Sequence, residues 1–295
     1  MLKRALFFSS PMSLSLKDNQ LVLSFKDIPD QKQTIPIEDV GFVVLEHAMI
    51  SITLPLLNAL VKNNVAVVLC DNTLMPSAML QPLEANNIQG ETYRNQIEAS
   101  EPLKKNLWKQ IIEAKINNQA RLLHKLGIND TPLKALSVNV KSGDPDNREG
   151  VAAKIYWTLL FGKTFCRKRE GAAPNNLLNY GYTILRAAVA RALVGSGLLP
   201  AFGIFHHNRY NAFPLADDLM EAYRPFVDEI VYTLYLNGET ELTKEVKAKL
   251  ARILFVDCLF LHTKRPLDIG LTATSASLAK CFASTQKKLS LPLLE

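Results

Sequence analysis

Residues 103–127 read LKKNLWKQIIEAKINNQARLLHKLG, and their apolar side chains recur near every third and fourth position. This period places the apolar side chains on one face of an α-helix, and Gly127 is a common kind of helix C-cap. The residues before this stretch alternate as strands do, whereas the residues after it keep the helical period. The stretch therefore divides the chain into a strand-rich start and a helical remainder.

The second part is expected to contain four further helices. They begin near Asn147 and cover about 175–194, 217–236 and 240–261, whereas the last twenty residues carry no clear pattern. Each stretch spaces its apolar residues for one buried face, which is typical of a packed all-α domain.

The first 80 residues are rich in β-branched and aromatic side chains and are broken by turn-forming residues such as Lys17-Asp18-Asn19. One helix is expected at about 54–63. The expected strands are 5–9, 14–16, 20–25, 33–37, 41–46 and 65–71.

Residues 83–98 lose both the strand alternation and the apolar density, so a linker is expected there. The chain has 295 residues, more than the roughly 100–150 of a common single domain. The sequence thus predicts an α+β protein, with a small N-terminal β-rich domain at 1–82, a linker at 83–98 and a larger all-α domain at 99–295.

Four scattered cysteines without C-x-x-C spacing predict buried, reduced thiols and make a zinc site built on them unlikely to form. The apolar run near the N-terminus is too brief for a signal-peptide core, and no stretch approaches the roughly 20 apolar residues that span a bilayer. A cytoplasmic location without a membrane partner is therefore expected.

Charge is divided unevenly along the chain. Residues 1–98 hold 7 Lys and Arg against 10 Asp and Glu, net −3, whereas residues 99–295 hold 27 against 18, net +9. The second part is therefore the expected binder of a polyanion. Its basic clusters include Arg167-Lys168-Arg169, a candidate contact to a DNA backbone.

Three short segments supply one imidazole and three carboxylates that the fold could bring together. Glu149 follows DPDNR, His206 lies in GIFHHNRYNAF, and Asp218 and Glu221 lie in LADDLMEAYRP. An i, i+3 spacing on a helix places Asp218 and Glu221 on one face. Carboxylate oxygens with one imidazole nitrogen favour a divalent metal such as Mg²⁺ or Mn²⁺.

Each element also has a structural alternative. With Asp146 as N-cap, Glu149 would fall in the first helical turn, where a carboxylate complements the helix dipole. Asp218 and Glu221 would serve equally well as a solvated first turn, and His206 as an ordinary loop residue. The combination of segments, rather than any one of them, indicates a site.

Read in order, these segments resemble the CRISPR-associated integrases of spacer acquisition, the Cas proteins numbered one. The matching stretches are NREGVAAKIYW (147–157), NLLNYGYTILR (176–186) and GIFHHNRYNAFPLADDLMEAYRP (203–225). They look most like the members that accompany single-protein RNA-guided effectors, the type II systems.

The resemblance implies that Glu149, His206 and Glu221 bind Mg²⁺ or Mn²⁺, with His206 as neutral imidazole. Asp218 is implied as the neighbouring acid of a four-residue catalytic set, and Asp217 has no family role. The family's histidine precedes that acid by twelve residues, which selects His206 over His207. Tyr156 and Tyr182 match aromatic positions near the family's active site, or else pack helices.

The activity that the resemblance implies is integration of spacer DNA into a CRISPR repeat. The 3′ hydroxyls of a spacer precursor would attack the repeat by transesterification, whereas attack by water would nick it. Implied partners are double-stranded DNA, a second copy joined through the β-rich domain, and a small Cas protein that bridges two dimers. The RNA-guided effector nuclease is a further partner left open.

Two other functions compete with this one on the sequence. The chain could be a non-catalytic DNA-binding scaffold of an adaptation or repair complex, its acids serving as caps and surface charges. It could also be a small-molecule metallohydrolase, but the net positive charge of the helical part disfavours that class.

Overall fold

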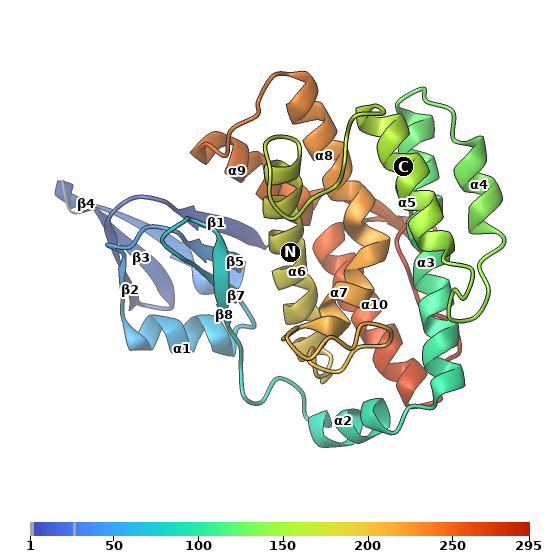
Figure 1. Cartoon of the computed structure of the whole chain (residues 1–295). Helices are drawn as coiled ribbons and strands as arrows, with labels where there is room; N and C mark the ends of the chain where they lie inside the picture. The colour runs from blue at the N-terminus through green and yellow to red at the C-terminus, as the bar shows by residue number, and fades with distance from the viewer. Residues whose placement is uncertain (1–2, 26–27) are drawn as a thin grey trace. The chain divides into compact units, whose positions relative to one another are not determined.

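The protein is described here by a computed structural model that covers residues 3–25 and 28–295. The chain divides into two compact units, Met1–Ala85 and Asn86–Glu295. Figure 1 shows strands in the first unit and mostly helices in the second, so the fold is α+β as predicted.

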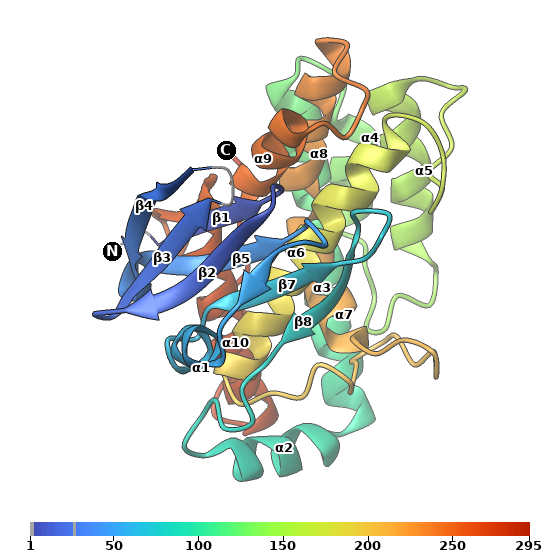
Figure 2. The same cartoon turned by 90° about the vertical axis from the view of Figure 1, so that its left-hand side faces the viewer.

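The first unit contains two four-stranded sheets and one helix, α1 (Leu54–Lys62) (Figure 2). One sheet has the order β1 (Arg4–Phe8), β5 (Val40–Leu45), β7 (Ala66–Cys70), β8 (Pro76–Leu80), with β7 and β8 antiparallel and the other pairs parallel. The other has the order β4 (Ile28–Pro36), β3 (Gln20–Phe25), β2 (Met12–Lys17), β6 (Ser51–Ile52). A short 3₁₀ turn, η1 (Ile37–Asp39), leads from β4 into β5.

Both sheets and α1 share one apolar core. Leu14 and Leu21 from one sheet, Val43 and Val67 from the other, and Leu60 of α1 belong to the same cluster, each at most 1% exposed. Because β5 has a neighbour on each side and is buried along its whole length, its sequence is the continuous apolar run VGFVVL.

The predicted strands lie within the observed ones or differ at their ends, but two strands of the first unit, β6 and β8, were not expected. β6 has only two residues, and β8 begins with Pro76, a residue that strand patterns place only at sheet edges. β4 also contains Pro29-Asp30, a residue pair that is typical of turns.

The segment expected as a linker contains helix α2 (Gln89–Ile97). Its buried side chains are polar, which is why its sequence lacks an apolar stripe. Gln96 donates to the carbonyls of Leu199 and Phe202, both at 2.9 Å, and accepts from the Leu199 amide at 2.9 Å. Hydrogen bonds thus anchor α2 to the loop after α6.

The second unit is built around α3 (Glu101–Lys125), whose buried side chains include Trp108, Ile111 and Ile112. This helix contacts α4, α5, α7, η2 and α8. The neighbouring elements are α4 (Thr131–Ser137), α5 (Arg148–Phe161), α6 (Asn175–Gly195), α7 (Pro214–Met220), η2 (Glu221–Tyr223), α8 (Arg224–Leu236), α9 (Lys244–Ala251), η3 (Arg252–Phe255) and α10 (Leu267–Phe282).

The helix expected at 217–236 is interrupted. Pro225 has no N–H to donate, and its ring would clash with the carbonyl of residue 221 in a continuous α-helix. The chain therefore passes through the 3₁₀ turn η2 between α7 and α8. This interruption places Glu221 at a junction between two helices.

The helix expected at 240–261 ends early, and the second unit is not all-α. After α9 and η3 the chain forms the antiparallel pair β9 (Asp257–Phe260) and β10 (Thr263–Pro266). Helix α10 then follows, where the sequence LTATSASLAK offers little contrast between apolar and polar faces. The segment after α10 is bonded to α3. Asn118 of α3 accepts from the Leu294 amide and donates to the carbonyls of Pro292 and, on η2, Ala222.

The cysteines are free, as expected, but not all are buried. Cys258 and Cys281 are buried, Cys70 is partly exposed and Cys166 is exposed. Within the residues that the structure describes, no helix combines the length and apolar character needed to cross a bilayer.

Close packing of α6 against α8 generates a stability prediction. A Cβ added at Gly181 would lie 2.5 Å from Cγ1 of Val227, a stiff, buried side chain. Gly181→Ala should therefore destabilise the protein by about 1–2 kcal/mol, because overpacking of about 1–3 kcal/mol outweighs the gain in helix propensity. Urea unfolding measures this change.

The matched control is Gly90→Ala in α2, where an added Cβ meets nothing within 4 Å. This change should be neutral or stabilising by up to about 1 kcal/mol. Equal effects of the two substitutions would contradict the packing argument.

Candidate active site

The first turn of α5 leaves the Glu149 side chain free for other contacts. The side chain of Asn147, the N-cap, accepts from the third amide of the helix, and the Asp144 carboxylate accepts from the first two at 2.8 and 3.0 Å. Asp146, the expected cap, instead forms an ion pair with Lys141 at 2.8 Å. Glu149 is therefore not needed as a capping carboxylate.

The Asp218 carboxylate shapes the loop that carries His206. It is fully buried and accepts from the amides of Ile204, Phe205 and His206 at 2.5, 3.0 and 3.2 Å. Gly203 allows this wrapping, because a Cβ there would lie 2.9 Å from Asp218 Oδ2 and 2.5 Å from the His206 carbonyl. Asp218 thus fixes the backbone and the side chain next to it.

The His206 ring is held through one nitrogen. Nδ1 lies 2.6 Å from Asp218 Oδ1, which selects the tautomer with Nδ1–H donating and leaves Nε2 with its lone pair. The hydrogen bond to Asp218 raises the pKa of His206; burial opposes the rise, and the charges of Asp218, Glu221 and Glu149 add to it.

Glu221 lies between two cations. Its Oε1 accepts from Arg224 Nε at 2.7 Å, and its Oε2 lies 2.5 Å from Lys115 Nζ. Burial alone would raise the pKa of Glu221, but the charges of Arg224 and Lys115 outweigh it and lower that pKa. The carboxylate is therefore ionised although only 6% of its side chain is exposed.

Lys115 joins Glu149 to Glu221. Its Nζ lies 2.6 Å from Glu149 Oε1 as well as 2.5 Å from Glu221 Oε2. Burial opposes the charge of Lys115, yet the two carboxylates raise its pKa, so the ammonium form is favoured. The structure thus brings Glu149 and Glu221, which are 72 positions apart, to one ammonium group.

The predicted ligands do not form a ready cation cage. Across residues 3–25 and 28–295, no three His, Cys, Asp or Glu side chains are arranged to hold a metal ion. The position between Glu149 and Glu221 is taken by the Lys115 ammonium, a stand-in for a cation. Glu221 Oε2 is buried and accepts no well-directed hydrogen bond despite the nearby Nζ. Two carboxylates that already share one cation are a donor set that fits a hard divalent ion.

The sequence singled out neither Lys115 nor Arg224 as part of the site. A signal for Lys115 was present, because the polar residues Lys115, Asn118 and Gln119 lie on the buried face of α3 among isoleucines and leucines. A buried charge without a partner is costly, so such a lysine indicates that a carboxylate faces it.

Tyr156 and Tyr182 are buried in a polar network behind Arg224. Tyr156 donates to Asp228 Oδ2 at 2.8 Å, and the Tyr182 hydroxyl donates to Asp228 Oδ1. The guanidinium groups of Arg224 and Arg167 lie over the Tyr182 ring at 4.4 and 5.3 Å. Both tyrosines therefore link helices through Asp228, and Tyr182 also supports the arginine that holds Glu221.

The basic cluster at 167–169 is partly committed to the protein itself. Arg167 donates to Asn175 at 3.1 Å and to Asn179 at 2.7 Å. Lys168 and Arg169 are exposed. A DNA-backbone contact at this loop remains a prediction for those two side chains.

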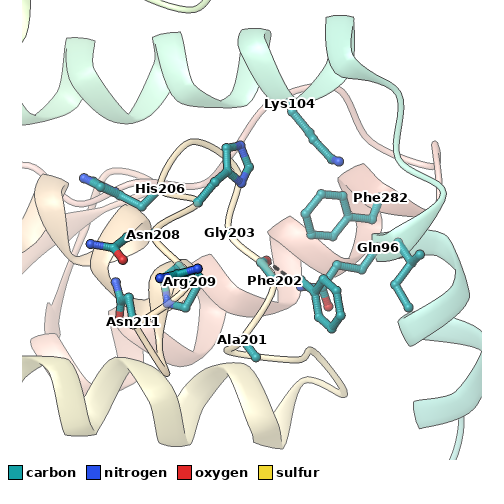
Figure 3. A pocket seen from close by; sticks show the side chains of 13 residues that line it. Gln96, Lys104, Ala201, Phe202, Gly203, His206, Asn208, Arg209, Asn211 and Phe282 are labelled. Carbon is teal, nitrogen blue, oxygen red and sulfur yellow. Dashed lines mark hydrogen bonds between the residues drawn. The ribbon is translucent and has the colours of Figure 1, made fainter.

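A cavity of about 540 Å³ lies beside His206 (Figure 3). Lys104 of α3, Phe282 of α10 and the loop residues Phe202 and Arg209 border it. His207, Asn208 and Asn211 add polar groups to the wall. Among the residues that the structure describes, no acidic side chain lines this cavity. This hollow therefore suits a negatively charged ligand.

A family model and curated relatives point to the same protein family. A family model described as CRISPR associated protein Cas1 matches residues 6–254. A CRISPR-associated endonuclease Cas1 from Neisseria meningitidis serogroup C (strain 8013) is 37% identical, over 96% of this chain and 91% of that protein. Another from Pyrobaculum aerophilum is 32% identical, over 73% of this chain and 79% of that one.

Solved structures share the fold. A casposase bound to integration product matches 98% of this chain and 93% of its own, with a TM-score of 0.79 and 21% identity. A CAS1 protein from Thermotoga maritima matches 97% and 99%, with a TM-score of 0.74 and 17% identity.

The buried Asp228 generates a prediction about pH. Burial raises its pKa to about 6 from 3.8, so the folded protein holds this proton more tightly than the unfolded chain. The resulting contribution to stability, about 2–3 kcal/mol, is fully present below about pH 4 and is lost as pH rises through 6. Relative to wild type, Asp228→Asn should therefore gain several degrees of Tm, roughly 5 °C, between pH 4.5 and 7.5.

Asp71→Asn is the control, because hydrogen bonds from Thr73 and Met75 lower the pKa of Asp71. Asp71 is thus ionised at both pH values and its substitution should give the same Tm difference at each. A pH-independent difference for Asp228→Asn would contradict the assignment.

Proposed function

The chain belongs to the CRISPR-associated Cas1 family, and from this we propose that it is a metal-dependent DNA integrase and endonuclease of spacer acquisition. Its reaction is attack by the 3′ hydroxyl of spacer DNA on a phosphodiester of a CRISPR repeat. The names of the relatives support DNA cleavage, and the casposase with an integration product supports strand joining.

The observation that carries this proposal is the convergence of Glu149 and Glu221 on Lys115. His206 also lines a cavity bordered by Lys104 and Arg209. Acids that accept a cation beside a hollow that accepts an anion are what a phosphodiester reaction needs.

Glu149, His206 and Glu221 are the residues that would hold Mg²⁺ or Mn²⁺. When bound, such an ion supplies Lewis-acid stabilisation of the charge that grows on the attacked phosphate. Asp218 forms a hydrogen bond with Nδ1 of His206, so Nε2 is the ring nitrogen that would bind the ion. Arg224 holds Oε1 of Glu221, so Oε2, which now faces Lys115, is the oxygen that would bind the ion.

The basic side chains around the cavity have a separate role. Lys104, Arg209 and His207 would contact phosphates of the DNA and orient the strand toward His206. Asn208 and Asn211 add neutral donors and acceptors on the same loop.

Assembly is also part of the proposal. We infer a homodimer formed through the first unit, which carries the exposed apolar residues Leu69, Leu74 and Leu80 on and between β7 and β8. Two such dimers bridged by a small Cas protein fit the similarity to a Cas6-RT-Cas1–Cas2 complex. That match covers 99% of this chain and 36% of the other, with a TM-score of 0.72 and 19% identity. All copies in this assembly would bind double-stranded DNA. The RNA-guided effector nuclease is a further candidate partner.

Removal of each proposed ligand tests the function. Glu149→Ala, His206→Ala and Glu221→Ala should each lower strand joining by at least about 100-fold in Mn²⁺, because loss of transition-state charge stabilisation has effects of this size. The assay follows a labelled DNA 3′ end into joined product and scores nicked product separately.

Glu113→Ala, which removes a partly exposed acid of α3 paired with Lys109, is the control and should keep joining at the wild-type rate. Thermal unfolding checks that all variants are folded. Wild-type joining by the three ligand variants would overturn the proposal, and metal-independent DNA binding without any joining would favour the non-catalytic scaffold.

The cavity wall generates a prediction about salt. Lys104→Ala and Arg209→Ala should each weaken DNA binding several-fold and reduce the slope of log Kd against log salt by roughly 0.9, as expected for one lost phosphate contact. Lys62→Ala, at an exposed position of α1, should leave both quantities unchanged. Fluorescence anisotropy over a salt series measures the affinity and the slope. An unchanged slope for both cavity variants would show that the cavity does not contact DNA phosphates.

A further inference from the structure

Lys115 is an unusual residue for its position in the fold. Among the buried residues of α3, a helix that the structure describes throughout, it is the one that carries a charge. Its side chain is only 8% exposed. A lysine is rarely buried unless it is paired, so its partners explain its presence.

Both partners are proposed ligands of the divalent ion. Nζ lies 2.6 Å from Glu149 Oε1 and 2.5 Å from Glu221 Oε2. Arg224 occupies the other Glu221 oxygen at 2.7 Å. Lys115 and Arg224 thus balance the charges of the two carboxylates without any added cation.

We propose that Lys115 is the resident counter-cation of this site, which holds Glu149 and Glu221 together until a divalent ion displaces its ammonium group. The inference rests on the proposed function in that it takes these carboxylates as ligands of the ion. It makes Lys115 a positioning residue that acts through Glu149 and Glu221.

The distances require this displacement. Coordination bonds to Mg²⁺, Mn²⁺ or similar ions are about 2.0–2.6 Å long, comparable to the contacts that Nζ now makes with the same oxygens. A dication and an ammonium group cannot both occupy that position, because they repel each other in a buried site. The flexible lysine stem lets the ammonium move while α3 stays in place.

Mn²⁺ titration of the DNA-free protein tests the displacement by calorimetry. Lys115→Met keeps the stem length but removes the competing charge, so it should bind Mn²⁺ about tenfold or more tightly than wild type. Lys115→Arg keeps the charge and should stay close to wild type. Equal or weaker Mn²⁺ binding by Lys115→Met would overturn the proposal.

Lys247→Met is the matched control for removal of a buried lysine. Lys247 is 6% exposed on α9, and its Nζ lies over the Tyr180 ring at 5.5 Å. Its loss should leave Mn²⁺ affinity unchanged. A gain equal to that of Lys115→Met would show a general charge effect and would count against the proposal.

A double-mutant cycle in EDTA tests the holding role without metal. Lys115→Met should lower Tm by roughly 5–10 °C, because it leaves the buried Glu221 and the partly exposed Glu149 without their shared cation. The same substitution in a Glu149→Gln background should lower Tm much less, because one negative charge is already gone. Equal losses in both backgrounds would reduce Lys115 to a packing role and overturn the proposal.

If Lys115→Met alone folds poorly, the double-mutant cycle still gives a result. The proposal then predicts that adding Glu149→Gln restores folding. Mn²⁺ binding by wild type without a gain in Lys115→Met would overturn this inference alone. Absence of Mn²⁺ binding by every variant would instead overturn the proposed function, and the EDTA cycle would then decide the holding role by itself.

Discussion

Two carboxylates cannot lie together in a protein interior unless positive charge lies beside them. This constraint organises the centre of the helical unit. Lys115 enters from α3 and Arg224 from the start of α8, and between them they engage Glu221 on both oxygens. The buried tyrosines behind Arg224 extend the same arrangement toward Asp228. The long helix α3 is thus the support of the site as well as of the core.

The Asp218–Glu221 pair shows how similar residues acquire different tasks. Their spacing predicted two acids on one helix face, but the chain changes from α7 to η2 between them. Asp218 turns to backbone amides and the imidazole, whereas Glu221 turns to cations. Local contacts therefore make one acid an organiser of the loop and the other the partner of Lys115 and Arg224.

The sequence predicted most strands and the long helices because those segments carry strong periodic patterns. It did not predict α2, whose buried face is polar, or α10, which is rich in serine, threonine and alanine. The candidate residues near His206 followed from motifs, yet the ammonium between Glu149 and Glu221 depends on a contact across 34 positions of sequence. Such a contact becomes visible only when the helices are packed.

Pro225 has a mechanical consequence for the centre. By ending α-helical hydrogen bonding at η2, it puts Glu221 on a single turn flanked by two independently bonded helices. Glu149, in contrast, lies in the first turn of the continuous helix α5. The two carboxylates that meet at Lys115 therefore depend on different kinds of backbone support, a 3₁₀ turn for one and an α-helical N-terminus for the other.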